Sequence, residues 1–123
     1  MAEWIWVATG GALGSVLRHG IAGTVNRWGD GWPHGTLTVN IVGSFAIGII
    51  STLGAERFLI PSHVRLLLIV GLLGGFTTFS AFSMETVTLF QGGEAGGAFS
   101  NLALSVLGCL FAAWVGISIA KLF

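Results

Sequence analysis

Two aromatic residues and two serines recur at helical spacing between residues 79 and 83. Phe79 and Phe82 lie three residues apart, as do Ser80 and Ser83 beside them, so each pair shares one face of a helix. An aromatic ring is negative on its face and positive at its edge, and a hydroxyl group donates a hydrogen bond. The pattern predicts an anion pathway without a full positive charge, which would bind an ion too tightly for conduction. The alternative is that Phe79 and Phe82 are simply core aromatics.

A second polar line precedes this segment. Thr36, Asn40 and Ser44 recur every four residues and therefore share one helix face. Polar groups at membrane depth are costly, and they usually face protein or a water-filled path. This face is a candidate part of the same pathway, unless Asn40 only forms hydrogen bonds between helices.

The sequence Gly-Gly-Phe-Thr-Thr over residues 74–78 predicts a break in a helix. Paired glycines and paired threonines are poor residues for a helix interior. A break frees backbone carbonyl and amide groups, which a membrane tolerates where they are buried in protein or line a cavity. Broken helices at the membrane midplane are recurrent ion sites. In an antiparallel dimer, about four carbonyls from two such breaks would suit a small hard cation.

The composition places these residues in a membrane. Of 123 residues, 54% are hydrophobic and 8% charged, whereas a soluble domain has roughly 25% charged residues. Four apolar stretches, at about residues 4–25, 35–53, 64–90 and 98–123, each reach the roughly 20 residues that a membrane-spanning helix needs. We expect an all-α membrane protein with one domain over residues 1–123, four transmembrane helices, and a third helix broken near the midplane.

The positive charges give almost no preferred orientation. An even number of crossings would place Arg57, Arg65 and Lys121 on one side and Arg18 and Arg27 on the other. Orientation follows the excess of Lys and Arg in the cytoplasmic loops, and here the difference is one residue. We interpret this balance as dual topology, with two oppositely oriented copies forming a homodimer. The alternative is a weakly determined single orientation.

Small residues repeat every four positions on all four stretches, which is typical of helices in close contact. These residues are Gly10 and Gly14, Ser44 and Gly48, Gly71 and Gly75, and Gly108, Ala112, Gly116 and Ala120. Packing within one chain explains part of the pattern, and a homo-oligomer would use the rest.

Two segments closely resemble the signature of the Fluc (CrcB) fluoride channels. They are residues 35–45, GTLTVNIVGSF, and residues 74–85, GGFTTFSAFSME. Residues 10–18, GGALGSVLR, also resemble the first helix of that family. The resemblance implies an antiparallel homodimer with two fluoride pathways in the inner (plasma) membrane. Passive export through it would protect the cell from fluoride.

The resemblance also implies roles for individual residues. The fluoride pathway would include Phe79, Phe82, Asn40, Ser80, Ser83, Thr36 and Ser105. The carbonyls of Gly74 and Thr77 would hold a structural sodium ion, Na+, at the two-fold axis. Arg18 and Glu85 match charged positions toward the helix ends. Family members often carry a tyrosine on the fourth helix, whereas this chain has none, and Asn101 or Ser105 would take its place.

Two other functions fit a small membrane protein of four helices. A dual-topology multidrug exporter needs a carboxylate within the membrane, but Glu3, Glu56, Glu85 and Glu94 lie in loops or near helix ends. A non-transporting membrane subunit would explain the glycines but not the polar line. No pair of catalytic His, Cys or carboxylate residues suggests an enzyme, and no basic stripe suggests binding of nucleic acid.

Overall fold

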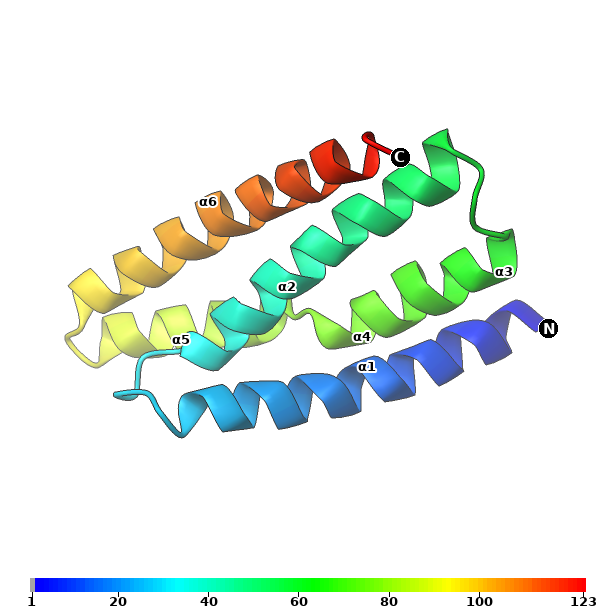
Figure 1. Cartoon of the computed structure of the whole chain (residues 1–123). Helices are drawn as coiled ribbons and strands as arrows, with labels where there is room; N and C mark the ends of the chain where they lie inside the picture. The colour runs from blue at the N-terminus through cyan, green and yellow to red at the C-terminus, as the bar shows by residue number, and fades with distance from the viewer. Residues whose placement is uncertain (1) are drawn as a thin grey trace.

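The computed structural model describes residues 2–123, and all regular structure in them is helical. The chain forms α1 (Ala2–Asn26), α2 (His34–Ser51) with the π-helical extension η1 (Thr52–Glu56), a third segment, and α6 (Ala95–Ala120). The third segment consists of α3 (Ser62–Arg65), the π-helical η2 (Leu66–Leu73), α4 (Gly74–Phe76) and α5 (Phe79–Gln91). The segments lie side by side, with both termini at the same end of the bundle (Figure 1).

Three helical stretches are long and apolar enough to cross a membrane: His34–Glu56, Ser62–Gln91 and Ala95–Ala120. At about 1.5 Å per residue, the 26 residues of α6 extend roughly 39 Å, which exceeds the ~30 Å hydrocarbon core of a bilayer. α1 has 25 residues and a similar length, but it is not among these three stretches. Its sequence is less apolar and contains Arg18 and His19.

Glycines let α1 pack against η2 and α4 at backbone distance. A Cβ atom added to Gly71 would lie 2.8 Å from the carbonyl oxygen of Val7, and one added to Gly75 would lie 2.6 Å from that of Gly11. Real Cβ atoms do not approach a backbone oxygen so closely. The glycines expected to form a contact face therefore do so within one chain.

Helices α2 and α6 are held together in the same way. A Cβ atom on Gly48 would overlap the carbonyl oxygen of Ala113, and a Cβ atom on Gly116 would overlap that of Phe45. Each glycine accommodates the backbone of the opposite helix, so the two small-residue faces predicted from the sequence meet each other. Close approach of backbones is how membrane helices gain van der Waals contact without a hydrophobic driving force.

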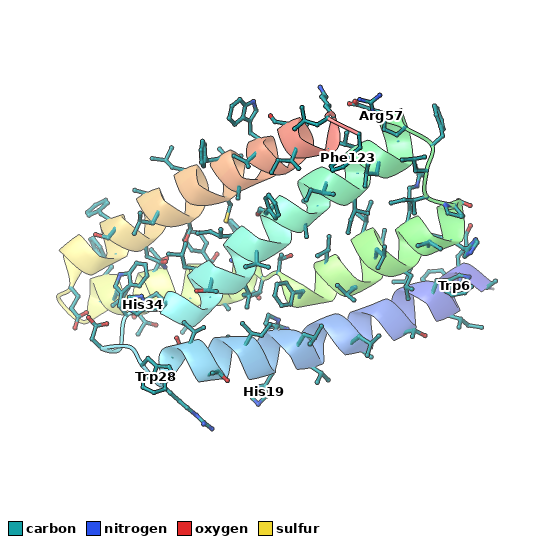
Figure 2. The ribbon with its side chains drawn as sticks, in the orientation of Figure 1. Trp6, His19, Trp28, His34, Arg57 and Phe123 are labelled. Carbon is teal, nitrogen blue, oxygen red and sulfur yellow. The ribbon has the colours of Figure 1, made fainter. Side chains whose placement is uncertain are left out.

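Side chains at the two ends of the bundle connect neighbouring segments. Arg57 donates a hydrogen bond to the carbonyl oxygen of Lys121, near the C-terminus of α6. Figure 2 shows Arg57 and Phe123 at this end, and Trp28 and His34 at the opposite end.

The loop before α2 is attached to the N-terminal turn of α6. The indole Nε1 of Trp32 donates to the carbonyl oxygen of Gly97 at 3.1 Å. The backbone N–H of Trp32 and the Nε2 of His34 both lie 3.2 Å from Oδ1 of Asp30. These contacts, led by the backbone N–H of Trp32, hold the pKa of the Asp30 carboxyl below its ordinary value. The start of α2 is thereby placed beside the N-terminal turn of α6.

We expect Gly116→Ala to destabilise the protein because the new methyl group would push α6 away from the Phe45 carbonyl. Overpacking of this kind costs about 1–3 kcal/mol, and thermal unfolding in detergent, followed by size-exclusion chromatography, would measure it. Gly96→Ala is the matched control on the same helix, since nothing lies within 4 Å of its added Cβ. Equal melting temperatures for the two variants would contradict the assigned contact.

Candidate functional site

The third segment is interrupted at Thr77 and Thr78. Helix α4 ends at Phe76, and both threonines have extended backbone, with φ/ψ of −86°/157° and −152°/119°. Helix α5 then begins at Phe79, and the Thr78 hydroxyl accepts a hydrogen bond from the backbone N–H of Ala81 at 3.1 Å. Thr78 is therefore the N-cap of α5, a position that favours threonine. The interruption lies beside α2 (Figure 1).

Asn40 pairs with the backbone of Thr78 on both sides of its amide group. Its Oδ1 accepts from the Thr78 N–H at 2.8 Å, and its Nδ2 donates to the Thr78 carbonyl at 3.0 Å. The two groups have lost their helical partners, and an asparagine side chain supplies one donor and one acceptor to replace them. Asn40 thus forms the hydrogen bond between helices that was the alternative to a pathway role. Its second N–H has no acceptor within residues 2–123.

Three carbonyl groups at the interruption have no donor among the described residues. Within residues 2–123, no group donates a hydrogen bond to the carbonyl oxygen of Gly74, Phe76 or Thr77. Nε of Arg18 donates to the Gly75 carbonyl at 3.1 Å, and the Thr77 hydroxyl donates to Leu73. Two of these three carbonyls, on Gly74 and Thr77, are the ones expected to bind sodium. Unwound backbone carbonyls suit such an ion chemically.

A cavity of about 470 Å³ lies next to the interruption. Its lining brings together six of the predicted site residues: Asn40, Gly74, Thr77, Phe79, Phe82 and Ser105. The ring centroids of Phe79 and Phe82 are 5.5 Å apart at an interplanar angle of 56°. Phe82 is 7% exposed and Phe79 is 78% exposed. The two rings belong to the first turn of α5, where the helix macrodipole carries its positive end.

The predicted hydroxyl donors differ in whether their protons are already used. Ser83 donates to the carbonyl of Phe79 at 2.9 Å. Ser80 lies 3.3 Å from the hydroxyl of Thr78, and either oxygen can be the donor. When Thr78 donates, the Ser80 proton is free to bind an anion. Ser80 is therefore the hydroxyl most readily available near the rings, although neither serine is among the residues that line the cavity.

Thr36, Arg18 and Glu85 lie outside the cavity lining. The Thr36 hydroxyl donates to Oε1 of Glu85 at 2.6 Å, and the buried Oε2 of Glu85 has no partner within residues 2–123. Arg18 contacts the carbonyl of Gly75 beside the interruption. Arg18 and Glu85, which we expected toward helix ends, each reach a partner on another helical segment.

Helix α6 contributes a polar network that its sequence only hinted at. Asn101, which is 1% exposed, donates from Nδ2 to the Thr86 hydroxyl at 2.9 Å. Thr86 in turn donates to the carbonyl of Phe82 at 2.7 Å. The Ser105 hydroxyl donates to Oδ1 of Asn101 at 3.3 Å. Sequence reasoning missed Thr86, and also Thr78, whose preference for N-cap positions was the available signal.

Known proteins resemble the chain over nearly its whole length. A family model described as CrcB-like protein, Camphor Resistance (CrcB), matches residues 5–117. A protein of Geobacter metallireducens named fluoride-specific ion channel FluC is 47% identical over 122 residues, which cover 98% of both chains. Proteins of the same name from Magnetococcus marinus and Opitutus terrae are 44% and 45% identical. Those matches cover 95% and 94% of this chain and 96% and 90% of theirs.

Proposed function

This chain belongs to the CrcB-like protein family, and we propose that it forms a fluoride-selective channel through which fluoride leaves the cell passively. The observation that carries the proposal is the cavity at the interruption, which gathers Phe79, Phe82 and Asn40 around the first turn of α5. Ring edges, an amide N–H and a helix N-terminus all favour an anion. The similar proteins are named ion channels, and we assign no enzymatic reaction to the chain.

The proposed pathway follows the face of α5 that carries the two phenylalanines. The ion is received by the ring edges of Phe79 and Phe82 and by the free hydroxyl proton of Ser80. The second N–H of Asn40 adds a further hydrogen-bond donor. Ser105 and Ser83 supply hydroxyls whose present hydrogen bonds an ion would replace, and Thr36 lies beyond them. Among residues 2–123, no cationic side chain lines the cavity, so the ion is held weakly enough to leave, as conduction requires.

A second, oppositely oriented copy completes the proposed channel. Phe79 is 78% exposed at the edge of the cavity, and a partner chain would cover it. The balance of three against two positive residues supports insertion in both orientations. In this proposal α1 also crosses the membrane, in addition to the three more apolar stretches. Four crossings place both ends of the chain on one side, which agrees with both termini lying at one end of the bundle (Figure 1). The dimer spans the inner membrane with two fluoride pathways.

A sodium ion on the two-fold axis is part of the proposal. The carbonyls of Gly74 and Thr77 have no donor among the described residues, so two chains would offer four oxygens. A bound cation would satisfy these groups at membrane depth, where an unsatisfied carbonyl is costly. It would also hold the two interruptions together. The ion has a structural role, and it does not move with fluoride.

We expect liposomes that contain the protein to release fluoride at least about a hundredfold faster than chloride, a ratio that corresponds to roughly 2.7 kcal/mol in barrier height. An ion-selective electrode would follow each anion after addition of a potassium ionophore. Protein purified and reconstituted without sodium should release fluoride more slowly. Equal fluoride and chloride rates would refute selectivity, whereas equal rates with and without sodium would remove only the structural ion.

Dual topology predicts that a single surface position faces both sides of the membrane. In a Cys109→Ser background, Trp28→Cys provides a label site, since Trp28 is 88% exposed in a loop. A membrane-impermeant maleimide added to intact cells should label about half of the molecules, because half of them face outward. Labelling of all molecules, or of none, would establish a single orientation.

Phe79→Ile and Phe82→Ile should each reduce fluoride flux severely while the dimer still assembles. Isoleucine keeps an apolar side chain, so the packing loss is about 1–3 kcal/mol, but it lacks the positive ring edge that can face an anion. Flux would be measured per assembled dimer after size-exclusion chromatography. Phe90→Ile is the control, as an exposed aromatic on the same helix outside the cavity. Wild-type flux in both pathway variants would show that Phe79 and Phe82 are only core residues.

A further inference from the structure

We infer that Asn101 is a positioning residue for ion conduction. It acts by holding Phe82 and Ser105 in a fixed relative position across the cavity. The inference rests on the proposed function, because it concerns residues of the proposed fluoride pathway. Asn101 itself is not among the residues that line the cavity. Its influence on an ion therefore passes through its neighbours.

The buried amide of Asn101 joins α5 to α6. Only 1% of the residue is exposed, and its side chain uses both the donor and the acceptor of the amide group. Nδ2 donates to Thr86 on α5 at 2.9 Å, and Oδ1 accepts from Ser105 on its own helix at 3.3 Å. A buried amide is costly when unpaired, so these contacts define one relative position of the two helices.

Both arms of this network end at the cavity. Thr86 donates to the carbonyl of Phe82 at 2.7 Å, and the Phe82 ring lines the cavity. Ser105 lines the same cavity from α6. One amide thus connects the turn of α5 that carries Phe82 with a hydroxyl on α6, on opposite helices of the proposed pathway.

The two hydrogen bonds that reach cavity residues, Thr86–Phe82 and Ser105–Asn101, differ in length. The shorter one holds its residue in place, and the longer one is more easily exchanged. The Thr86–Phe82 bond is at the usual length for a hydroxyl donor, whereas the Ser105–Asn101 bond is long. A passing anion would accept the hydrogen bond of the Ser105 hydroxyl in place of Asn101, and Ser105 would donate to Asn101 again once the anion has left. The Phe82 backbone would stay in place throughout.

The adjacent residue Glu85 strengthens the case for register. Glu85 accepts a hydrogen bond from Thr36 of α2, and the next residue, Thr86, accepts one from Asn101 of α6. Consecutive positions on α5 are therefore bound to two different helices. A shift of α6 along α5 would break the Asn101–Thr86 bond and leave the Thr36–Glu85 bond intact. Asn101 is therefore the residue that sets the position of α6 relative to α5.

Two variants test this inference by different routes. Asn101→Leu keeps the bulk of the side chain and removes both arms, while Thr86→Val keeps the Asn101–Ser105 contact and removes the arm to Phe82. We expect each to lower fluoride flux per assembled dimer about tenfold and to lower the fluoride-to-chloride ratio as well. The double variant should be no worse than the more impaired single variant, since residues of one network are not additive. Ser100→Ala, which loses only a bond to Gly96 within α6, should match the wild type.

The selectivity ratio separates positioning from a purely structural role. A residue that only stabilises the fold would change the amount of assembled dimer and leave the ratio unchanged. An unchanged ratio in both assembled variants, additive losses in the double variant, or failure of both variants to assemble would each overturn the inference. If the wild type itself carries no fluoride, the proposed function fails; a wild type that conducts beside variants with wild-type ratios refutes only the role of Asn101.

Discussion

The backbone at Thr77 and Thr78 must be satisfied without the help of water, and much of the structure follows from this requirement. An interrupted helix in a membrane leaves N–H and C=O groups that would each cost several kcal/mol if they met lipid. Asn40 takes up the N–H and the carbonyl of Thr78, and Arg18 takes up the carbonyl of Gly75. The carbonyls of Gly74 and Thr77, two residues that line the cavity, have no donor among the described residues. Neighbouring helices therefore pair part of the backbone that the interruption leaves without helical hydrogen bonds, and the rest remains as polar groups.

Glycine packing makes these repairs possible because it determines how closely the helices approach. The side chain of Arg18 reaches the Gly75 carbonyl because α1 lies against α4 at backbone distance, with Gly11 facing Gly75. In the same way α2 and α6 meet at Gly48 and Gly116, which keeps Asn40 and Ser105 at one cavity. Bulkier faces would widen the separations, and short polar side chains would no longer span them.

Most of the hydroxyl groups near the cavity already have hydrogen-bond partners in the protein. Ser83, Thr77 and Thr86 donate to carbonyls four residues before them, which is a common arrangement for such residues within helices. An ion that enters must exchange these bonds or use the few protons that remain, chiefly on Ser80 and Asn40. An anion that replaces existing hydrogen bonds binds more weakly than one that binds a cationic side chain. Weak binding suits a conduction pathway, because the ion must also leave.

Features that depend on residues close together in the chain could be predicted from the sequence. Helical spacing put Phe79 and Phe82 on one face, where their rings do lie together, and four-residue repeats of small side chains identified Gly71, Gly75 and Gly116 as contact points. Tertiary structure alone decided how the polar groups are used. Asn40 and Thr78 are 38 positions apart, and Thr36 and Glu85 are 49 apart. Periodicity shows which face of a helix a side chain occupies. The partner opposite that face depends on how whole helices pack, and no local pattern encodes contacts between residues so far apart in the sequence.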